Sequence, residues 1–382
     1  MVIGIDGNEA NIEKRVGVNV YAFELLRAIW QLQKKGVVNH QLIVFLKRPP
    51  LSDMPKETQN FKYKIIRGSG GWILTKLMPH LWRNLEGLNI IFSPSHYVPP
   101  ICLQPRACSI MDLGYLKSST QFKKCDYWQL KYWSAISIFV SNVVFAISVN
   151  TKEEIVRKYP FASKKVVVTP LAYDPNLFNM KVAKEDIERV KDKYTIVSDY
   201  ILFLSTLKPS KNIEGLIQAF AMLNAKYQML NGIKLVIAGK KGWLYRSIFE
   251  KVKKLGLEGK VVFTDFIPEK DKPALIAGAK VFCLPSFHEG FGLDVLNAMA
   301  CGIPAVVSNK GSLPEVGGDA GVYVNPDSSE SIAEGLNKVL SMDNIEYNKL
   351  VTKGLEQVKK FSWEKTALTT LKGLENVSRQ KR

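Results

Sequence analysis

Residues 281–304 read VFCLPSFHEGFGLDVLNAMACGIP, and this stretch decides the fold of the chain. An apolar run at 281–285 leads into a glycine-punctuated turn, after which Leu293, Leu296 and Ala300 recur at helical spacing. Gly302 and Pro304 then end the helical pattern. The stretch therefore predicts a strand, a tight loop and a helix.

The same loop could hold an anion. Gly290 and Gly292 allow the backbone to approach a ligand closely, and the first amides of the following helix point toward that position. A phosphate is the obvious candidate. The alternative is that the two glycines only turn a strand into a helix, as in an ordinary α/β unit.

Length and composition predict a globular protein with two domains. The chain has 382 residues, more than one hydrophobic core usually organises, and it is 46% hydrophobic and 23% charged. The five Cys residues are scattered and lack a Cys-x-x-Cys spacing, which predicts reduced, buried thiols in a cytoplasmic protein. Residues 1–6 already show a strand pattern containing an acid, so no secretory signal is expected.

The longest uncharged run covers residues 132–151, about the length needed to cross a bilayer. Ser134, Ser137, Ser141, Asn142 and Ser148 interrupt it. We therefore interpret the run as a buried helix followed by a strand at 143–147.

The net charge of +18 is unevenly distributed. Residues 1–150 carry 18 Lys and Arg against 9 Asp and Glu, half of the whole excess. A basic surface attracts nucleic acid, anionic lipid or a phosphorylated substrate without choosing between them, and it can also serve solubility alone. We expect no nucleic-acid partner because the sequence contains no recognition module for one.

Strand patterns separated by helix-length segments run through both halves of the chain and predict an α/β fold with parallel sheets. In the first half, a polar loop leads to Gly17 at the start of a helix. Residues 174–200 have the composition of a connection between domains. We predict two Rossmann-like, doubly wound domains facing each other across a cleft. They cover residues 1–175 and 176–360, and a final helix at 361–382 crosses back to the first domain.

Three side chains at the ends of predicted strands could carry chemistry. Lys211 lies at a helix start, where a cation would clamp a diphosphate but where lysines are more often only solvated. Glu289 could cap the following helix or bind the hydroxyls of a sugar, and Asp112 could cap its loop or face a ligand. With four His residues, no His-Glu-x-x-His and no Asp-x-Asp, the sequence predicts no metal site and no cofactor.

These residues resemble a known family. The runs 285–293, 298–304 and 312–320 look like the signature of the retaining glycosyltransferases of family four, also called glycosyl transferases group 1, which have the GT-B fold. Further matches, in the family's order, occur over nearly the whole chain: 3–6, Gly17, 112–113, Ser148, 211–212 and 361–365.

The resemblance implies a nucleotide-sugar donor held mainly by the second domain and an acceptor held by the first. It assigns Lys211 and the amides near Phe291, Gly292 and Leu293 to the donor diphosphate, with the Gly17 loop opposite. Glu289 would contact the donor sugar. Among the remaining site residues, Thr206 would lie beside the phosphates, Ile267 against the base, and Asp112 in the catalytic centre.

Two positions depart from the family pattern. The second Glu of its paired-Glu motif, which holds the ribose hydroxyls, is Asn297 here, and the common His before Asp112 is Met111. Asn can still bind a diol, but as a neutral partner it should bind more weakly. Asp294 also stands where the family commonly has Pro.

The resemblance predicts a metal-independent, retaining transferase that moves a hexose, mannose or glucose, from a nucleotide-diphosphate sugar to a lipid-linked or polysaccharide acceptor. We expect it in the cytoplasm, and the basic first 150 residues suit a peripheral position on an anionic membrane surface at the inner face. The alternative is a non-catalytic protein of the same fold that binds nucleotide sugars, and Asn297 and Met111 favour that alternative.

Overall fold

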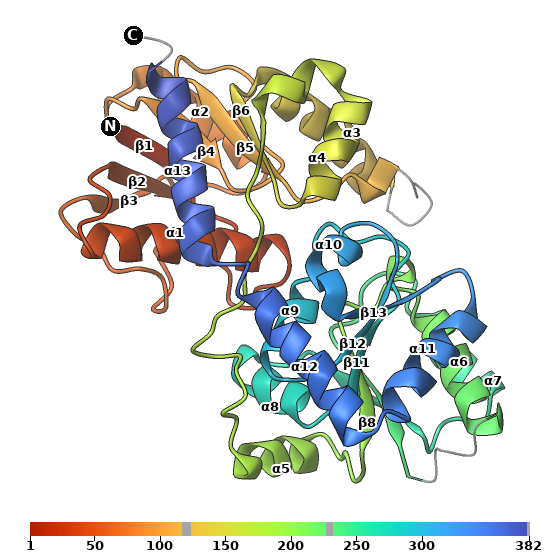
Figure 1. The fold of residues 1–382 in the computed structure, drawn as a ribbon. Coiled ribbons are helices and arrows are strands. Elements are labelled where there is room, and N and C mark those ends of the chain that lie inside the picture. The colour runs from red at the N-terminus through yellow and green to blue at the C-terminus, as the bar shows by residue number, and fades with distance from the viewer. Residues whose placement is uncertain (117–123, 227–231, 380–382) are drawn as a thin grey trace. The chain divides into compact units, whose positions relative to one another are not determined.

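The computed structural model describes residues 1–116, 124–226 and 232–379 and contains two compact α/β units (Figure 1). The first unit is made of Met1–Leu171 and Ser362–Arg382, and the second of Ala172–Phe361. Each unit has its own parallel sheet with flanking helices. The predicted α/β class is confirmed.

The first sheet has seven parallel strands in the order β3-β2-β1-β4-β5-β6-β7. Its inner strands are almost entirely apolar and buried, as parallel strands covered on both faces must be, whereas the edge strand β3 is mostly exposed or partly buried. They are β1 (Val2–Asp6), β2 (Gln41–Leu46), β3 (Phe61–Ile65), β4 (Ile90–Ser93), β5 (Arg106–Ile110), β6 (Val143–Ala146) and β7 (Val166–Val168). The helices of this unit are α1 (Val18–Lys34), η1 (Ile73–Leu77), α2 (Met78–Arg83), η2 (Gly114–Leu116), α3 (Lys124–Val140), α4 (Val149–Lys158), η4 (Pro160–Lys165) and α13 (Trp363–Arg379).

The last helix, α13, packs on the first unit beside α1 (Figure 1). Its first residue, Trp363, is buried with its ring centroid 6.3 Å from that of Tyr21. Thr366 Oγ1 donates to the Pro170 carbonyl at 2.5 Å, and Glu375 Oε1 lies 2.7 Å from His40 Nε2. Aromatic packing and polar contacts therefore fix α13 along its length.

The interpretation of residues 132–151 needs a correction. A strand is present at Val143–Ala146, but α3 is not a buried helix. Ile136 and Phe139 are exposed, whereas Ser134 and Ser137 are fully buried because Ser134 contacts His96 Nδ1 at 3.2 Å and Ser137 accepts from the Val98 amide at 3.1 Å. Among the described residues, no helix is long and apolar enough to cross a membrane.

The second sheet has six parallel strands in the order β10-β9-β8-β11-β12-β13. The sequence reading missed β13, a short strand whose residues are only partly buried. The strands are β8 (Tyr200–Leu204), β9 (Lys234–Ala238), β10 (Val261–Asp265), β11 (Val281–Leu284), β12 (Ala305–Ser308) and β13 (Gly321–Val324). The helices are α5 (Lys184–Lys193), η5 (Pro209–Lys211), α6 (Ile213–Lys226), α7 (Arg246–Lys254), η6 (Glu269–Asp271), α8 (Lys272–Ala277), α9 (Leu293–Ala300), α10 (Leu313–Gly317), η7 (Gly318–Ala320), α11 (Ser329–Leu340) and α12 (Asn344–Val358).

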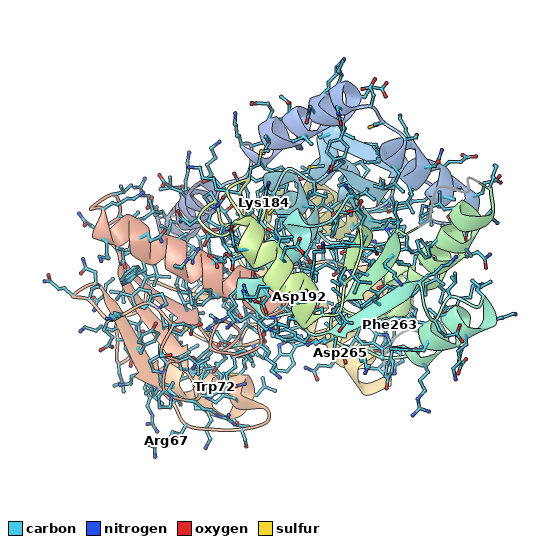
Figure 2. All side chains as sticks on the ribbon, turned by 90° about the horizontal axis from the view of Figure 1, so that it is seen from below. Arg67, Trp72, Lys184, Asp192, Phe263 and Asp265 are labelled. Carbon is cyan, nitrogen blue, oxygen red and sulfur yellow. The ribbon has the colours of Figure 1, made fainter. Side chains whose placement is uncertain are left out.

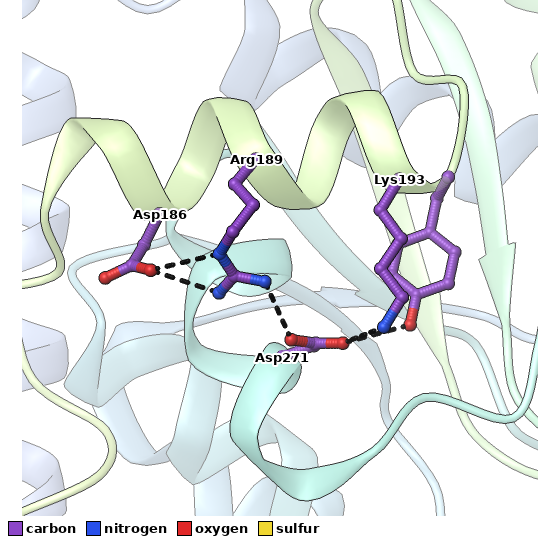
Figure 3. A network of polar contacts seen from close by, with 5 residues as sticks. Asp186, Arg189, Lys193 and Asp271 are labelled. Carbon is purple, nitrogen blue, oxygen red and sulfur yellow. Dashed lines mark hydrogen bonds and ion pairs between the residues drawn. The ribbon is translucent and has the colours of Figure 1, made fainter.

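The charge-rich segment expected to be a connection contains α5, which Lys184 and Asp192 mark near its two ends (Figure 2). The fully buried Asp271 holds this helix, since it accepts from Lys193 Nζ at 2.5 Å and Arg189 Nη1 at 3.3 Å (Figure 3). Burial alone would raise the pKa of Asp271, but these hydrogen bonds hold the pKa below its usual value. The helix is therefore fixed to the second unit.

The cysteine prediction is confirmed for three residues and wrong for one. Cys108, Cys283 and Cys301 are free and buried, and burial raises the pKa of the Cys108 thiol to about 12. Cys102 is free but only partly buried. The side chain of Cys125 lies outside the described part of the chain.

Candidate active site

The topology of the second sheet marks one position as a ligand site. The chain proceeds from β8 to β9 on one side and from β11 to β12 on the other, so the winding direction switches between the adjacent strands β8 and β11. Open α/β sheets bind ligands outside the carboxyl ends of the strands at such a point. Lys211 follows β8 and Glu289 follows β11.

Lys211 and Glu289 meet as a buried ion pair. The ammonium group of Lys211 donates to Glu289 Oε1, and each residue is only 8% exposed. Ser286 Oγ, fully buried, donates to the same carboxylate oxygen at 2.9 Å. Glu289 is not the N-cap of α9, because Gly292 occupies that position. Two charges taken from water at a sheet switch point cost desolvation free energy, which favours a functional role over a structural one.

Backbone hydrogen bonds hold the loops that carry this pair. Asn212 has a left-handed backbone with φ of 53°, and its Nδ2 donates to the carbonyls of Pro285 at 3.1 Å and Pro326 at 2.7 Å. The Phe287 amide donates to the Ser210 carbonyl at 3.0 Å. The segments after β8, β11 and β13 therefore form one rigid frame around the pair.

A second frame comes from the segment after β12. Ser312 Oγ, fully buried, donates to the carbonyls of Glu289 at 3.1 Å and Phe291 at 2.8 Å. Gly311 has φ of +64°, and a Cβ there would lie 2.8 Å from the Glu289 carbonyl oxygen. The sequence reading assigned no role to Ser286 or Ser312. The Ser-x-x-Glu spacing could have indicated Ser286, but no local pattern connects Ser312 to a residue 23 positions earlier.

Helix α9 begins beside this loop. Its N-cap residue Gly292 has φ of +96° and offers no side chain to cap the first amides of the helix. Of the predicted positions, Phe291 directly precedes the N-cap Gly292, and Leu293 and Asn297 lie in the helix itself. Asn297 is 2% exposed and donates from Nδ2 to Asp294 Oδ1 at 3.1 Å. Its buried Oδ1 accepts no hydrogen bond within the described residues.

Asp294 has an altered acidity. Burial raises the pKa of its carboxyl, Lys272 and the hydrogen bond from Asn297 oppose that rise, and Glu269 and Glu289 add to it. Lys272 also lies 2.6 Å from Glu269 Oε2, so it keeps a partner when Asp294 is neutral. The site therefore contains a carboxyl with a raised pKa, that of Asp294, next to the side-chain amide of Asn297.

The acidity of Asp294 predicts a pH effect on stability. The ordinary pKa of an Asp carboxyl is 3.8, and the pKa of Asp294 in the folded protein is higher. The stability that the protonated carboxyl contributes is therefore complete below pH 3.8 and is lost as the pH rises from 3.8 through the folded-state pKa. The Asp294→Asn variant has no carboxyl to ionise at this position. Its free energy of unfolding, measured with urea, should therefore rise relative to that of the wild type as the pH increases from 3.8 to neutrality. The exposed Asp327→Asn should stay within about 0.5 kcal/mol of the wild type throughout. A stability difference for Asp294→Asn that does not change with pH would contradict this.

Two more predicted positions of the second unit, Thr206 and Ile267, also follow carboxyl ends of strands. Thr206 follows β8 and lies close to two glycines. A Cβ added to Gly242 would lie 3.1 Å from Thr206 Cγ2, and a Cβ added to Gly239 would lie 3.4 Å from the amide nitrogen of Thr206. Ile267 is buried after β10, two strands from β8 in the sheet order. The structure thus joins Lys211 directly to Glu289, which lies three residues before the N-cap of α9, while Thr206 lies in the loop after β8 and Ile267 after β10, two strands away.

Gly17 and Asp112 belong to the first unit, where both follow carboxyl ends of strands of the first sheet. Gly17 is the N-cap of α1 with φ of +52°. Asp112 Oδ1 accepts from the Gly114 amide at 2.7 Å, so it does cap its own loop. The Met111 amide donates to His96 Nε2 at 3.3 Å, and burial lowers the pKa of that imidazole although the charge of Asp112 opposes the shift.

Comparison with known proteins agrees with this geometry. The family model of glycosyl transferases group 1 matches residues 186–357. The O-antigen chain mannosyltransferase B of Escherichia coli is 34% identical over 237 residues, which are 62% of this chain and 61% of that relative. The chain thus spans less than two thirds of the length of that relative. An uncharacterised glycosyltransferase of Methanocaldococcus jannaschii is 30% identical over 276 residues, 69% of each chain.

Among solved structures, HepE from Anabaena in complex with UDP-glucose matches with a TM-score of 0.73 and 17% identity, covering 98% of this chain and 99% of that one. At this identity the match shows the fold alone. The chain therefore belongs to the glycosyl transferases group 1 family and has the GT-B fold, as its sequence motifs predicted.

Proposed function

We propose that the protein is a retaining, metal-independent mannosyltransferase that moves its sugar from a nucleotide-diphosphate donor to a lipid-linked or polysaccharide acceptor. The observation that carries this is the buried Lys211 and Glu289 pair at the switch point of the second sheet. The name of the O-antigen mannosyltransferase supports mannose over glucose, and the UDP-glucose bound to HepE supports a nucleotide-sugar donor.

Lys211 would bind the donor diphosphate. Without a ligand its charge is balanced by Glu289, and a phosphate oxygen would replace the carboxylate as its partner. The first amides of α9, which no side chain caps, would bind the same anion. As the bond between the sugar and the phosphate breaks, charge develops on the leaving group, and a fixed cation with fixed amides stabilises it without rearranging. Gly17 and Thr206 would complete the phosphate contacts.

Glu289 would then be free to bind a hydroxyl of the donor sugar. Ser286 keeps one carboxylate oxygen in place while the ammonium group of Lys211 turns to the phosphate. The carboxylate therefore positions the sugar and does not attack it, unlike the nucleophile of a retaining hydrolase. In this proposal the acceptor oxygen bonds to the sugar on the face that the phosphate leaves, and a phosphate oxygen takes the acceptor proton, which retains the configuration.

Asn297 would bind the ribose diol of the donor. Its buried Oδ1 has an unused acceptor position, and its Nδ2 is held by Asp294. A buried acceptor without a partner costs about 1–3 kcal/mol, which a ligand hydroxyl would recover. Ile267 would lie against the base and Asp112 near the acceptor, as the family resemblance implies.

The test is a panel of donors with the purified protein. We expect release of nucleoside diphosphate from GDP-mannose in the presence of a mannose-terminated oligosaccharide, slower release from UDP-glucose, and no change on adding EDTA. Donor binding is measured in parallel by calorimetry. Binding without any release would instead favour the non-catalytic alternative suggested by Asn297 and Met111, and an inactivation by EDTA would overturn the metal-independent mechanism.

A further inference from the structure

The first unit exposes five large apolar side chains at one edge of its sheet. Each lies in the segment that directly precedes one of the adjacent strands β4, β5, β6 and β7, and each is 54–70% exposed. The five, here called the apolar edge, are Leu85, Ile101, Leu103, Phe139 and Phe161. Because all strands of the sheet are parallel, the segments before them meet at the same edge.

Hydrogen bonds join these segments into one surface. Gln104 Nε2 donates to Asn84 Oδ1 at 2.8 Å, which joins the segments before β4 and β5. The Asn142 amide donates to the Arg106 carbonyl at 2.8 Å, which joins those before β5 and β6. Lys165 Nζ donates to the Phe139 carbonyl at 2.9 Å, which joins those before β6 and β7. The apolar edge is therefore continuous along four strands.

Helix α3 extends this surface. Its residues Tyr132, Ile136 and Phe139 are exposed, whereas Ser134, Ser137 and Ile138 are fully buried. The Phe139 ring packs edge-on against Phe161 with centroids 5.7 Å apart. The three exposed residues are four and three positions apart, so they share one face of the helix. An exposed apolar face of this kind marks a site of contact with a partner less polar than water.

The charge around the apolar edge indicates which partner. The four segments, 81–89, 98–106, 139–142 and 157–165, contain six basic residues and one acidic residue, Glu86, which lies 2.8 Å from His80. The basic residues are Arg83, Arg106, Arg157, Lys158, Lys164 and Lys165. Lysine is depleted in interfaces between proteins, whereas aromatic side chains flanked by Lys and Arg are typical of the surface of an anionic bilayer.

We propose that the apolar edge docks on an anionic lipid bilayer. Its Leu, Ile and Phe side chains would enter the boundary between headgroups and acyl chains. The exposed basic residues Arg83, Arg157, Lys158 and Lys164 would contact lipid phosphates, while Arg106 and Lys165 hold backbone carbonyls of the surface. The apolar edge lies at the amino ends of the strands, while ligands of such sheets bind at the carboxyl ends. Docking therefore leaves the loops with Gly17 and Asp112 open, and it does not depend on the reaction proposed above.

The test is cosedimentation with vesicles of phosphatidylcholine containing about 30% phosphatidylglycerol. We expect the wild type to bind, and Phe139→Ser combined with Phe161→Ser to lower the partition coefficient about tenfold or more. Both side chains are exposed, so folding should persist, which circular dichroism checks. This variant keeps every charge, so it separates docking from the general attraction of a basic protein.

The matched control removes two exposed apolar side chains from the second unit, Val197→Ser with Ile345→Ser, each 79% exposed. It should bind vesicles like the wild type. Equal binding of the control and the Phe139 and Phe161 variant would overturn the proposal. A wild type that does not bind vesicles would also overturn it. If that protein instead self-associates through these residues, the surface is an interface with a second copy of the chain.

Discussion

Replacing Lys211 with alanine is expected to lower donor turnover by about 10²–10³-fold, the effect of removing one group that stabilises a developing oxyanion. The same change should lower the free energy of unfolding by about 3–5 kcal/mol, because it leaves the buried carboxylate of Glu289 without its counter-charge. Nucleoside diphosphate release and urea unfolding measure the two effects separately.

The matched control is Lys226→Ala, which breaks the ion pair with Glu330 in the same unit. That pair spans 3.5 Å and its side chains are 53% and 60% exposed. Exposed pairs contribute about 0–1 kcal/mol, so stability and turnover should stay close to the wild type.

A double variant separates the two roles of the pair. Adding Glu289→Gln to Lys211→Ala removes the uncompensated charge, so we expect part of the lost stability to return while turnover stays low. A double variant that recovers activity along with stability would show that Lys211 acts only by balancing Glu289, and the diphosphate role would be wrong.

The pattern around residues 281–304 was sufficient to predict much of this structure. The run after residue 281 and the helix with Leu293 and Leu296 formed as expected, because apolar periodicity reflects burial directly. Lys211 was more ambiguous, since a lysine at a helix start is usually solvated. Its burial depends on Glu289, 78 residues later, and that pairing follows from the adjacency of β8 and β11.

The sequence could not predict features that depend on contacts between distant segments. The uncharged run containing Ser134 and Ser137 suggested a buried helix, but these hydroxyls turn inward to meet His96 and Val98. The buried face of α3 thus combines two hydrogen-bonded serines with the apolar Ile138, while Ile136 and Phe139 are exposed. For the same reason no periodicity could reveal Ser312, whose partners lie in a different loop.

The approach of two strand ends near Thr206 depends on Gly239. The Ser205 amide donates to the Ala238 carbonyl at 3.0 Å and the Leu207 amide to the Lys240 carbonyl at 2.9 Å, so the chain leaving β8 runs along the chain leaving β9. Gly239 has φ of +142°, and a Cβ there would lie 1.9 Å from the Ser205 carbonyl oxygen. Neither backbone can move without breaking these hydrogen bonds.

Gly239→Ala is therefore expected to destabilise the protein by about 3–5 kcal/mol, combining backbone strain with overpacking against a carbonyl group. Gly259→Ala is the control, because it is exposed and a Cβ there meets nothing within 4 Å. It should be neutral or stabilise by up to about 1 kcal/mol. Because Thr206 directly follows Ser205, whose carbonyl the new methyl group would displace, any folded Gly239→Ala protein should also bind the donor diphosphate more weakly. Equal urea midpoints for the two variants would show that the strand ends are not held together as this geometry requires.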